Sequence, residues 1–182
     1  MGVRKDIGAR SGILWVDFTD PSQDELELLA KEFNIDPLIM MGSLDSEHLP
    51  KFERLESHEF MILRLYDENC TKDADTTQEL TRKIALFWKG PFLISIHRNP
   101  LRVIDLISEK WSRRSLVQTS LSTITHQILL GVVDSYDRPI DAALTQLENL
   151  EMSIFGADGA QPFDLKEGYY LKGKSFVFKR LL

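Results

Sequence analysis

The spacing of hydrophobic residues predicts strands in the first half of the chain and helices in the second. Short runs of β-branched and aromatic residues predict strands at 12–18, 60–66, 83–88 and 92–97. The second of these runs is almost entirely apolar, as in a strand that is covered on both faces. A three-residue connection containing Gly90 joins the last two runs, and it predicts a hairpin.

Helix start signals precede three amphipathic segments. Asp20 fits the N-cap, and Pro21 the first position, of a helix with apolar residues at helical spacing. An Asp-Pro pair at 36–37 repeats this signal before a short helical turn. An Asn-Pro pair at 99–100 repeats it before an amphipathic helix over 101–114.

From Ser120 to Phe155 the chain has no strand signal and instead carries an apolar stripe whose spacing alternates between three and four. The stripe consists of Val133, Tyr136, Ile140, Ala143, Leu147, Leu150 and Ile154. This heptad pattern is typical of a helix that packs lengthwise on another helix. Pro139 must kink or interrupt that helix, because its ring clashes with the preceding turn. The glycines and proline of 156–162 predict a break.

Composition is ordinary for a globular domain, with 43% hydrophobic and 27% charged residues. The net charge of −6 excludes nucleic acid as the main partner, since phosphate binding needs a basic surface. The run Ile128–Val133 is far shorter than the roughly 20 apolar residues that cross a bilayer. A single cysteine, Cys70, excludes a disulfide framework and a cysteine-rich zinc site, and it is interpreted as an ordinary surface thiol.

No motif in the sequence indicates an enzyme. The sequence has no glycine-rich phosphate loop, no nucleophile elbow and no pair of histidines at metal-ligand spacing. His97 beside Arg98 is either part of an anion site or a polar residue at the end of a strand, and the second interpretation is favoured.

Two acidic groups are candidates for cation binding. Asp45, Glu47 and His48 are the densest set of hard-metal ligands within one turn, with a solvated loop as the alternative. A second set follows the apolar stripe along the predicted long helix. In the functional interpretation, this set attracts cations or a basic surface such as the C-terminal segment. The alternative is that it is simply the exposed face of an amphipathic helix. Its members are Asp134, Asp137, Asp141, Glu148 and Glu151.

Several segments together resemble the cytoplasmic domain of CorA-type magnesium/cobalt channels. The segment ILWVDFTDPSQDELELLAKEFNIDPL is similar to the family's opening strand and helix. FLISIHRNPL resembles its hairpin strand, LLGVVDSYDRPIDAALTQLENLE its long helix, and YYLKGKSFVFKRLL the start of its stalk helix. The resemblance covers nearly the whole chain.

The resemblance implies an α/β/α sandwich, with a mixed sheet between helix layers, followed by long helices. We expect an α/β domain at 1–118, a helical hairpin segment packing on it at 119–160 and the start of a truncated stalk helix at 161–182. Family members are homopentamers whose pore helices carry a Gly-Met-Asn motif, and both are missing here. The abrupt stop at Leu182 predicts a fragment that is soluble by itself, from a protein at the cytoplasmic face of the bacterial inner membrane.

The expected function is therefore the regulatory, or gating, domain of a Mg²⁺/Co²⁺ channel or transporter, with a divalent cation as substrate or regulator and no enzymatic activity. Alternatives are a zinc-transporting relative and a free-standing helical interaction module. Met41, Gly42 and Leu130 stand where the family has regulatory acids, and these residues cannot hold Mg²⁺. Asp45, Glu47 and His48 lie close enough to the first of these positions to be substitutes.

Overall fold

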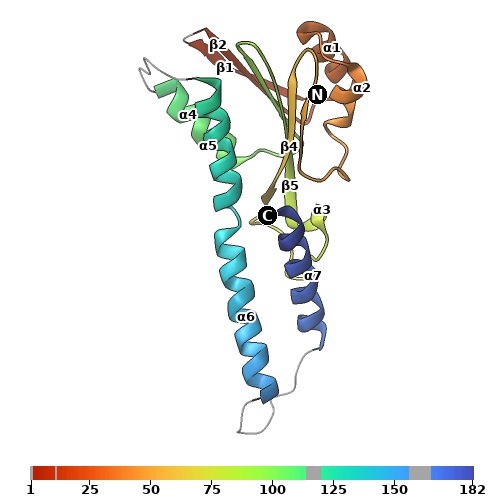
Figure 1. Cartoon of the computed structure of the whole chain (residues 1–182), viewed down its shortest axis with the longest axis vertical. Coiled ribbons are helices and arrows are strands. Elements are labelled where there is room, and N and C mark those ends of the chain that lie inside the picture. The colour runs from red at the N-terminus through yellow and green to blue at the C-terminus, as the bar shows by residue number, and fades with distance from the viewer. Residues whose placement is uncertain (1, 11, 114–119, 156–164) are drawn as a thin grey trace. The chain divides into compact units, whose positions relative to one another are not determined.

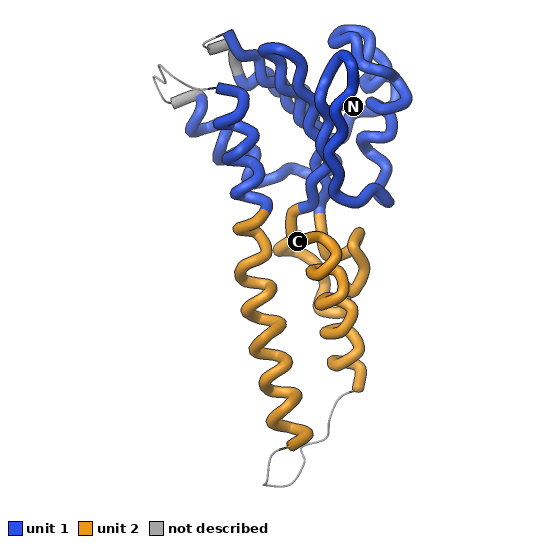
Figure 2. The backbone as a smooth tube through the Cα atoms, in the orientation of Figure 1, with its two compact units in different colours: residues 1–64, 82–132 blue, residues 65–81, 133–182 orange. Residues whose placement is uncertain are grey.

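The computed structural model describes residues 2–10, 12–113, 120–155 and 165–182, which form two compact units (Figure 2). Unit 1 comprises 1–64 and 82–132, and unit 2 comprises 65–81 and 133–182. The predicted domain boundaries near 118 and 160, and the predicted break at 156–162, lie outside the described residues.

Unit 1 is built on a six-stranded mixed sheet in the order β1-β2-β6-β5-β4-β3 (Figure 1). The strands are β1 (Val3–Arg10), β2 (Ile13–Thr19), β3 (Lys51–Arg54), β4 (Glu59–Tyr66), β5 (Thr81–Lys89) and β6 (Phe92–His97). β2 runs parallel to β6, and the pairs β1–β2, β3–β4 and β5–β6 are antiparallel. The four predicted strands and the hairpin are confirmed, whereas β1 and β3 were not predicted.

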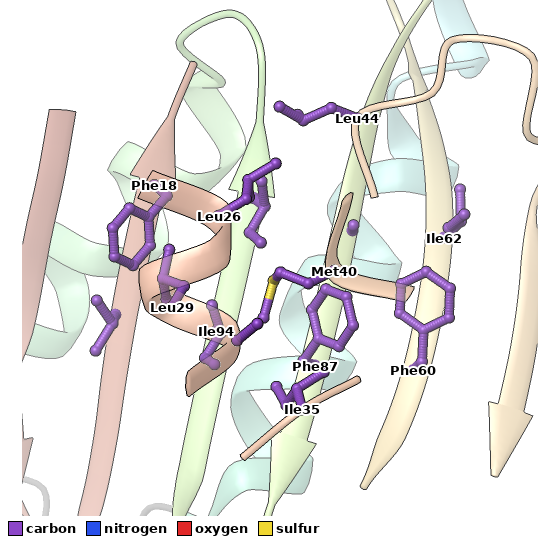
Figure 3. Close-up of a cluster of buried hydrophobic side chains, with 14 residues drawn as sticks. Phe18, Leu26, Leu29, Ile35, Met40, Leu44, Phe60, Ile62, Phe87 and Ile94 are labelled. Atoms are coloured by element: carbon purple, nitrogen blue, oxygen red, sulfur yellow. The ribbon is translucent and has the colours of Figure 1, made fainter. Parts of the chain in front are cut away.

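The first face of the sheet is covered by α1 (Gln23–Phe33) and α2 (Pro37–Gly42). Their apolar side chains pack on alternate residues of four strands and form the principal core, in which Met40, Phe60 and Phe87 are almost fully buried (Figure 3). The predicted N-cap of α1 is wrong by two residues. Ser22 is the cap, with Glu25 completing a capping box, while Asp20 adopts a left-handed turn conformation with φ of 50°.

The second face of the sheet is covered by α4 (Arg102–Arg113) and α5 (Leu121–Asp134), which completes the predicted α/β/α sandwich (Figure 1). Ile104, Ile107 and Trp111 of α4 are buried, as are Ile124 and Ile128 of α5. The two helices approach closely at Gly131, where an added Cβ would lie 2.2 Å from a Val103 methyl carbon.

Unit 2 contains the short α3 (Thr77–Leu80) and two long helices, α6 (Asp137–Phe155) and α7 (Leu165–Leu181). Helices α6 and α7 contact one another, but Val133, Leu147 and Ile154 of the apolar stripe are 53%, 45% and 50% exposed, so among the described residues no helix covers the whole stripe. The predicted interruption is present, because α5 ends at Asp134 and α6 begins at Asp137. Pro139 explains this position, since its ring excludes the carbonyl of Ser135, four residues earlier.

Tyr136 lies in the interruption and is 1% exposed. Its ring packs edge-on against Tyr66 and Phe178, with ring centroids 6.3 and 6.0 Å away. The backbone N–H of Tyr66 donates to Ser135 Oγ at 3.0 Å. These contacts hold the start of α6 and the end of α7 together within unit 2.

Candidate functional site

The candidate metal ligands Asp45, Glu47 and His48 lie in the loop after α2. One carboxylate oxygen of Asp45 accepts the backbone N–H of Glu47 at 2.9 Å, and the other lies 3.6 Å from His48 Nε2. The hydrogen bond from Glu47 is the largest cause of the lowered pKa of Asp45, and the nearby His48 adds to it. Asp45 is therefore held as a carboxylate on an exposed loop.

The side chains of Arg64 and Lys83 bind the backbone of this loop from the other side and form a clamp. Arg64, which is 3% exposed, donates to the carbonyl oxygen of His48 at 2.9 Å and to that of Ser46. Lys83 on the neighbouring strand donates to the carbonyl oxygen of Asp45. These carbonyls already have donors, so a divalent ion would have to bind through the carboxylates on the exposed side.

Burial and the nearby Arg64 lower the pKa of Lys83 to about 8. Across the ranges that the structure describes, no group of three or more His, Cys, Asp or Glu side chains is arranged to hold a metal ion. The assignment of Asp45, Glu47 and His48 as metal ligands stays a prediction.

The loop lies beside Gly42, one of the positions where an acid of the family is replaced, as expected from the sequence. A Cβ added to Gly42 would lie 3.5 Å from His48 Cε1, which is ordinary van der Waals contact. Met41 is half-buried beside it, and Leu130 on α5 is 48% exposed. A side chain at position 42 would therefore meet the loop that carries the candidate acids.

A buried polar network on the second face of the sheet was missed by sequence reasoning. Trp15 Nε1 donates to Ser95 Oγ at 3.0 Å, and the Ser95 hydroxyl donates to Asp17. His97 Nε2 lies 3.1 and 3.2 Å from the two carboxylate oxygens of Asp17. All four residues are 5% exposed or less. The sequence did carry a signal for this network, because Asp17, Ser95 and His97 are polar residues within two otherwise apolar strands.

This network does not form a catalytic site. Ser95 bonds to the aspartate rather than to the histidine, and its side chain is fully buried. His97 Nδ1 lies 2.7 Å from the carbonyl oxygen of Asn99, so both ring nitrogens face acceptors. Arg98 instead pairs with Asp20 at 3.6 Å. His97 is thus a buried strand-end residue, as favoured from the sequence.

The remaining candidates lie in unit 2. The five acids of the second set are exposed, and four of them line α6, while Asp134 ends α5. Cys70 is half-buried, and its Sγ lies 3.1 Å from the hydroxyl oxygen of Tyr66. Burial and this sulfur raise the pKa of Tyr66. None of the described helices has the length and apolar character needed to cross a membrane.

Comparison with known proteins identifies relatives of this architecture. The family model described as "CorA-like Mg2+ transporter protein" matches residues 10–182. The cobalt/magnesium transport protein CorA of Methanocaldococcus jannaschii is 26% identical over 145 residues, which cover 76% of this chain and 43% of that protein.

Two solved structures match the fold over 93% of this chain at 18% sequence identity. They are the full-length CmaX protein, with a TM-score of 0.74 and 50% of its chain covered, and the ZntB cytoplasmic domain from Vibrio parahaemolyticus, with a TM-score of 0.69 and 64% covered. The chain thus spans less than half of the curated CorA sequence that it matches. Because the family model covers almost the whole chain, this protein belongs to the CorA-like Mg²⁺ transporter family.

Proposed function

We propose that this chain is the cytosolic regulatory domain of a divalent-cation channel or transporter. The observation that carries the proposal is the family match over 10–182, on a chain that corresponds to 43% of the CorA relative. The transported ions would be Mg²⁺ and Co²⁺, and the domain would lie at the cytoplasmic face of the inner membrane.

The proposed regulation follows from electrostatics. The chain has a net charge of −6, and its α6 acids are exposed, so its surface attracts cations. In a homo-oligomer, which the family resemblance suggests to be a pentamer, acids that face one another across subunits repel. A bound divalent ion relieves that repulsion and favours the conformation in which the acids are close. Intracellular Mg²⁺ would thereby act on the pore.

The coding region beyond Leu182 tests this proposal directly. We expect the rest of a long helix and then two segments of about 20 apolar residues with Gly-Met-Asn between them. A stop codon after Leu182 would contradict the proposal and favour a free-standing interaction module. The fold likeness to the ZntB domain keeps zinc as the alternative ion, and transport measured with the complete protein would distinguish the two ions.

The loop after α2 is our candidate for the regulatory ion. A double variant, Asp45→Ala with Glu47→Ala, should lose the rise in melting temperature that Mg²⁺ gives the unmodified chain. At a Mg²⁺ concentration ten times the Kd, that rise corresponds to about 1.4 kcal/mol.

The matched control is Glu56→Ala with Glu68→Ala, which removes the same charge from exposed positions outside both candidate acidic groups. This control should keep the Mg²⁺-dependent rise. An equal rise in the loop variant would remove Asp45 and Glu47 as ligands.

A further inference from the structure

A cleft of about 530 Å³ opens on the first face of the sheet in unit 1, beside the turn between β5 and β6. Ile35, Phe87 and Ile94 are buried and, with Leu14, form its apolar floor, while Phe33 and the more exposed Phe92 also line it. Three of the floor residues, Ile35, Phe87 and Ile94, belong to the principal core (Figure 3). The volume is within the range of small-molecule sites.

The cleft exists because the strands extend beyond the helix that covers them. Helix α1 ends at Phe33, and Asn34 turns the chain away in a left-handed conformation with φ of 50°. The strands continue, since Leu14 pairs with Phe92 and Lys89 also pairs with Phe92. The apolar face therefore continues past its cover, and Phe92 remains 36% exposed.

The side walls favour a flat ring. Phe33 and Phe92 meet edge to face, with ring centroids 5.7 Å apart and an interplanar angle of 71°. Aromatic side chains prefer such edge-on or offset partners, so a planar apolar group in the cleft would find favourable contacts. Burial of this exposed apolar surface supplies the driving force for binding.

The charges around the cleft favour an anion. Glu32 lines the cleft, but both its carboxylate oxygens accept from Arg4, at 2.9 and 3.0 Å. Lys89 also lines it and, two residues after Phe87 on β5, is on the same face of the sheet. Among the described residues, Lys89 forms no ion pair. The cleft thus joins an apolar floor to one uncompensated cation.

We propose that this cleft binds a small aromatic carboxylate, with its ring on the apolar floor against the edges of Phe33 and Phe92 and its carboxylate at the Lys89 ammonium group. Such a ligand would bind in the domain itself and apart from the acidic loop after α2.

The test uses 4-phenylbutyrate and its uncharged analogue 4-phenylbutanamide, titrated into the chain by calorimetry. NMR of the methyl groups of Leu14, Ile35 and Ile94 locates the ligand. We expect shifts at these methyl groups and a Kd for the carboxylate roughly two- to fivefold below that of the amide, the range of an exposed ion pair. Lys89→Gln should make the two affinities equal, while Phe92→Ala should weaken binding of both ligands.

Lys110→Gln is the matched control, because it removes the same charge from an exposed position of α4. It should change neither affinity. Absence of methyl shifts at millimolar carboxylate in the folded, unmodified chain would overturn the proposed site. Equal binding of acid and amide, or an unchanged preference in Lys89→Gln, would overturn the role of Lys89.

Discussion

Lys83 is the residue whose ionisation the fold alters most clearly on the first face of the sheet. Its ammonium group is partly buried near Arg64, Arg98 and Lys51, and these like charges add to the effect of burial. Asp45 acts in the opposite direction but does not cancel them. The pKa therefore falls from 10.5 to about 8 in the folded protein.

This lowered pKa makes the free energy of unfolding rise with pH. Between about pH 8 and 10.5 Lys83 is neutral in the folded chain and still charged in the unfolded chain, so the unfolded state binds more protons. Stability from this group therefore rises with pH in that window and is lost as the pH falls through 8. The rise is at most about 1.4 kcal/mol per pH unit, and solvent screening lowers it.

Lys83→Met should remove this rise, measured as the difference in unfolding free energy from the unmodified chain at several pH values. Lys110→Met, at an exposed position, should leave the profile unchanged. A Lys83→Met profile parallel to that of the unmodified chain would contradict the assignment.

Asp17 is the second residue with a large expected effect. The Asp17 carboxylate is buried, where it accepts from the Ser95 hydroxyl and lies 3.1 and 3.2 Å from His97 Nε2. Asp17→Asn replaces one acceptor oxygen by an amide NH2 group, which leaves a buried polar group without a partner, and should destabilise the chain by about 1–3 kcal/mol in denaturant unfolding. Asp105→Asn, which breaks only the exposed pair with Lys5, should cost less than about 1 kcal/mol. Similar losses in the two variants would refute the buried pair.

At the scale of elements, the contact between α4 and α5 depends on the absence of a side chain at Gly131. A methyl group there would overlap Val103 at 2.2 Å. Gly131→Ala should therefore destabilise the chain by about 1–3 kcal/mol, the usual cost of overpacking. Adding Val103→Ala should recover part of this loss, because it removes the overlapping methyl carbon. A double-mutant cycle without coupling would show that the helices do not meet as described.

Elements with a local sequence signal were predicted, and elements that depend on distant pairing were not. The apolar runs of β4, β5 and β6 and the proline in the first turn of α6 determine structure locally. β1 carries four charged residues among its eight and lies at an edge of the sheet, where its pairing with β2 makes it a strand. The single turn of α3 had a signal, the capping box of Thr76 and Glu79, but it lies in a polar segment without hydrophobic periodicity.

The same distinction applies to the candidate site. Asp45, Glu47 and His48 are close in sequence, so their proximity was predictable. The clamp by Arg64 and Lys83 comes from two strands farther along the chain, and sequence spacing alone could not place these cations at the loop. The cleft beside Lys89 depends on where α1 ends relative to three strands, which is also a property of the assembled sheet.

At the scale of the whole molecule, the family model that matches residues 10–182 places this chain in the CorA-like Mg²⁺ transporter family. The central claim is that the domain regulates divalent-cation passage through a complete membrane protein. Mg²⁺ influx into vesicles that contain the complete protein is the most direct measurement, with Mg²⁺ varied on the side that carries this domain. Our account predicts influx that slows as Mg²⁺ on that side rises. Absence of any divalent-cation influx, or influx that ignores Mg²⁺ on that side, would contradict it.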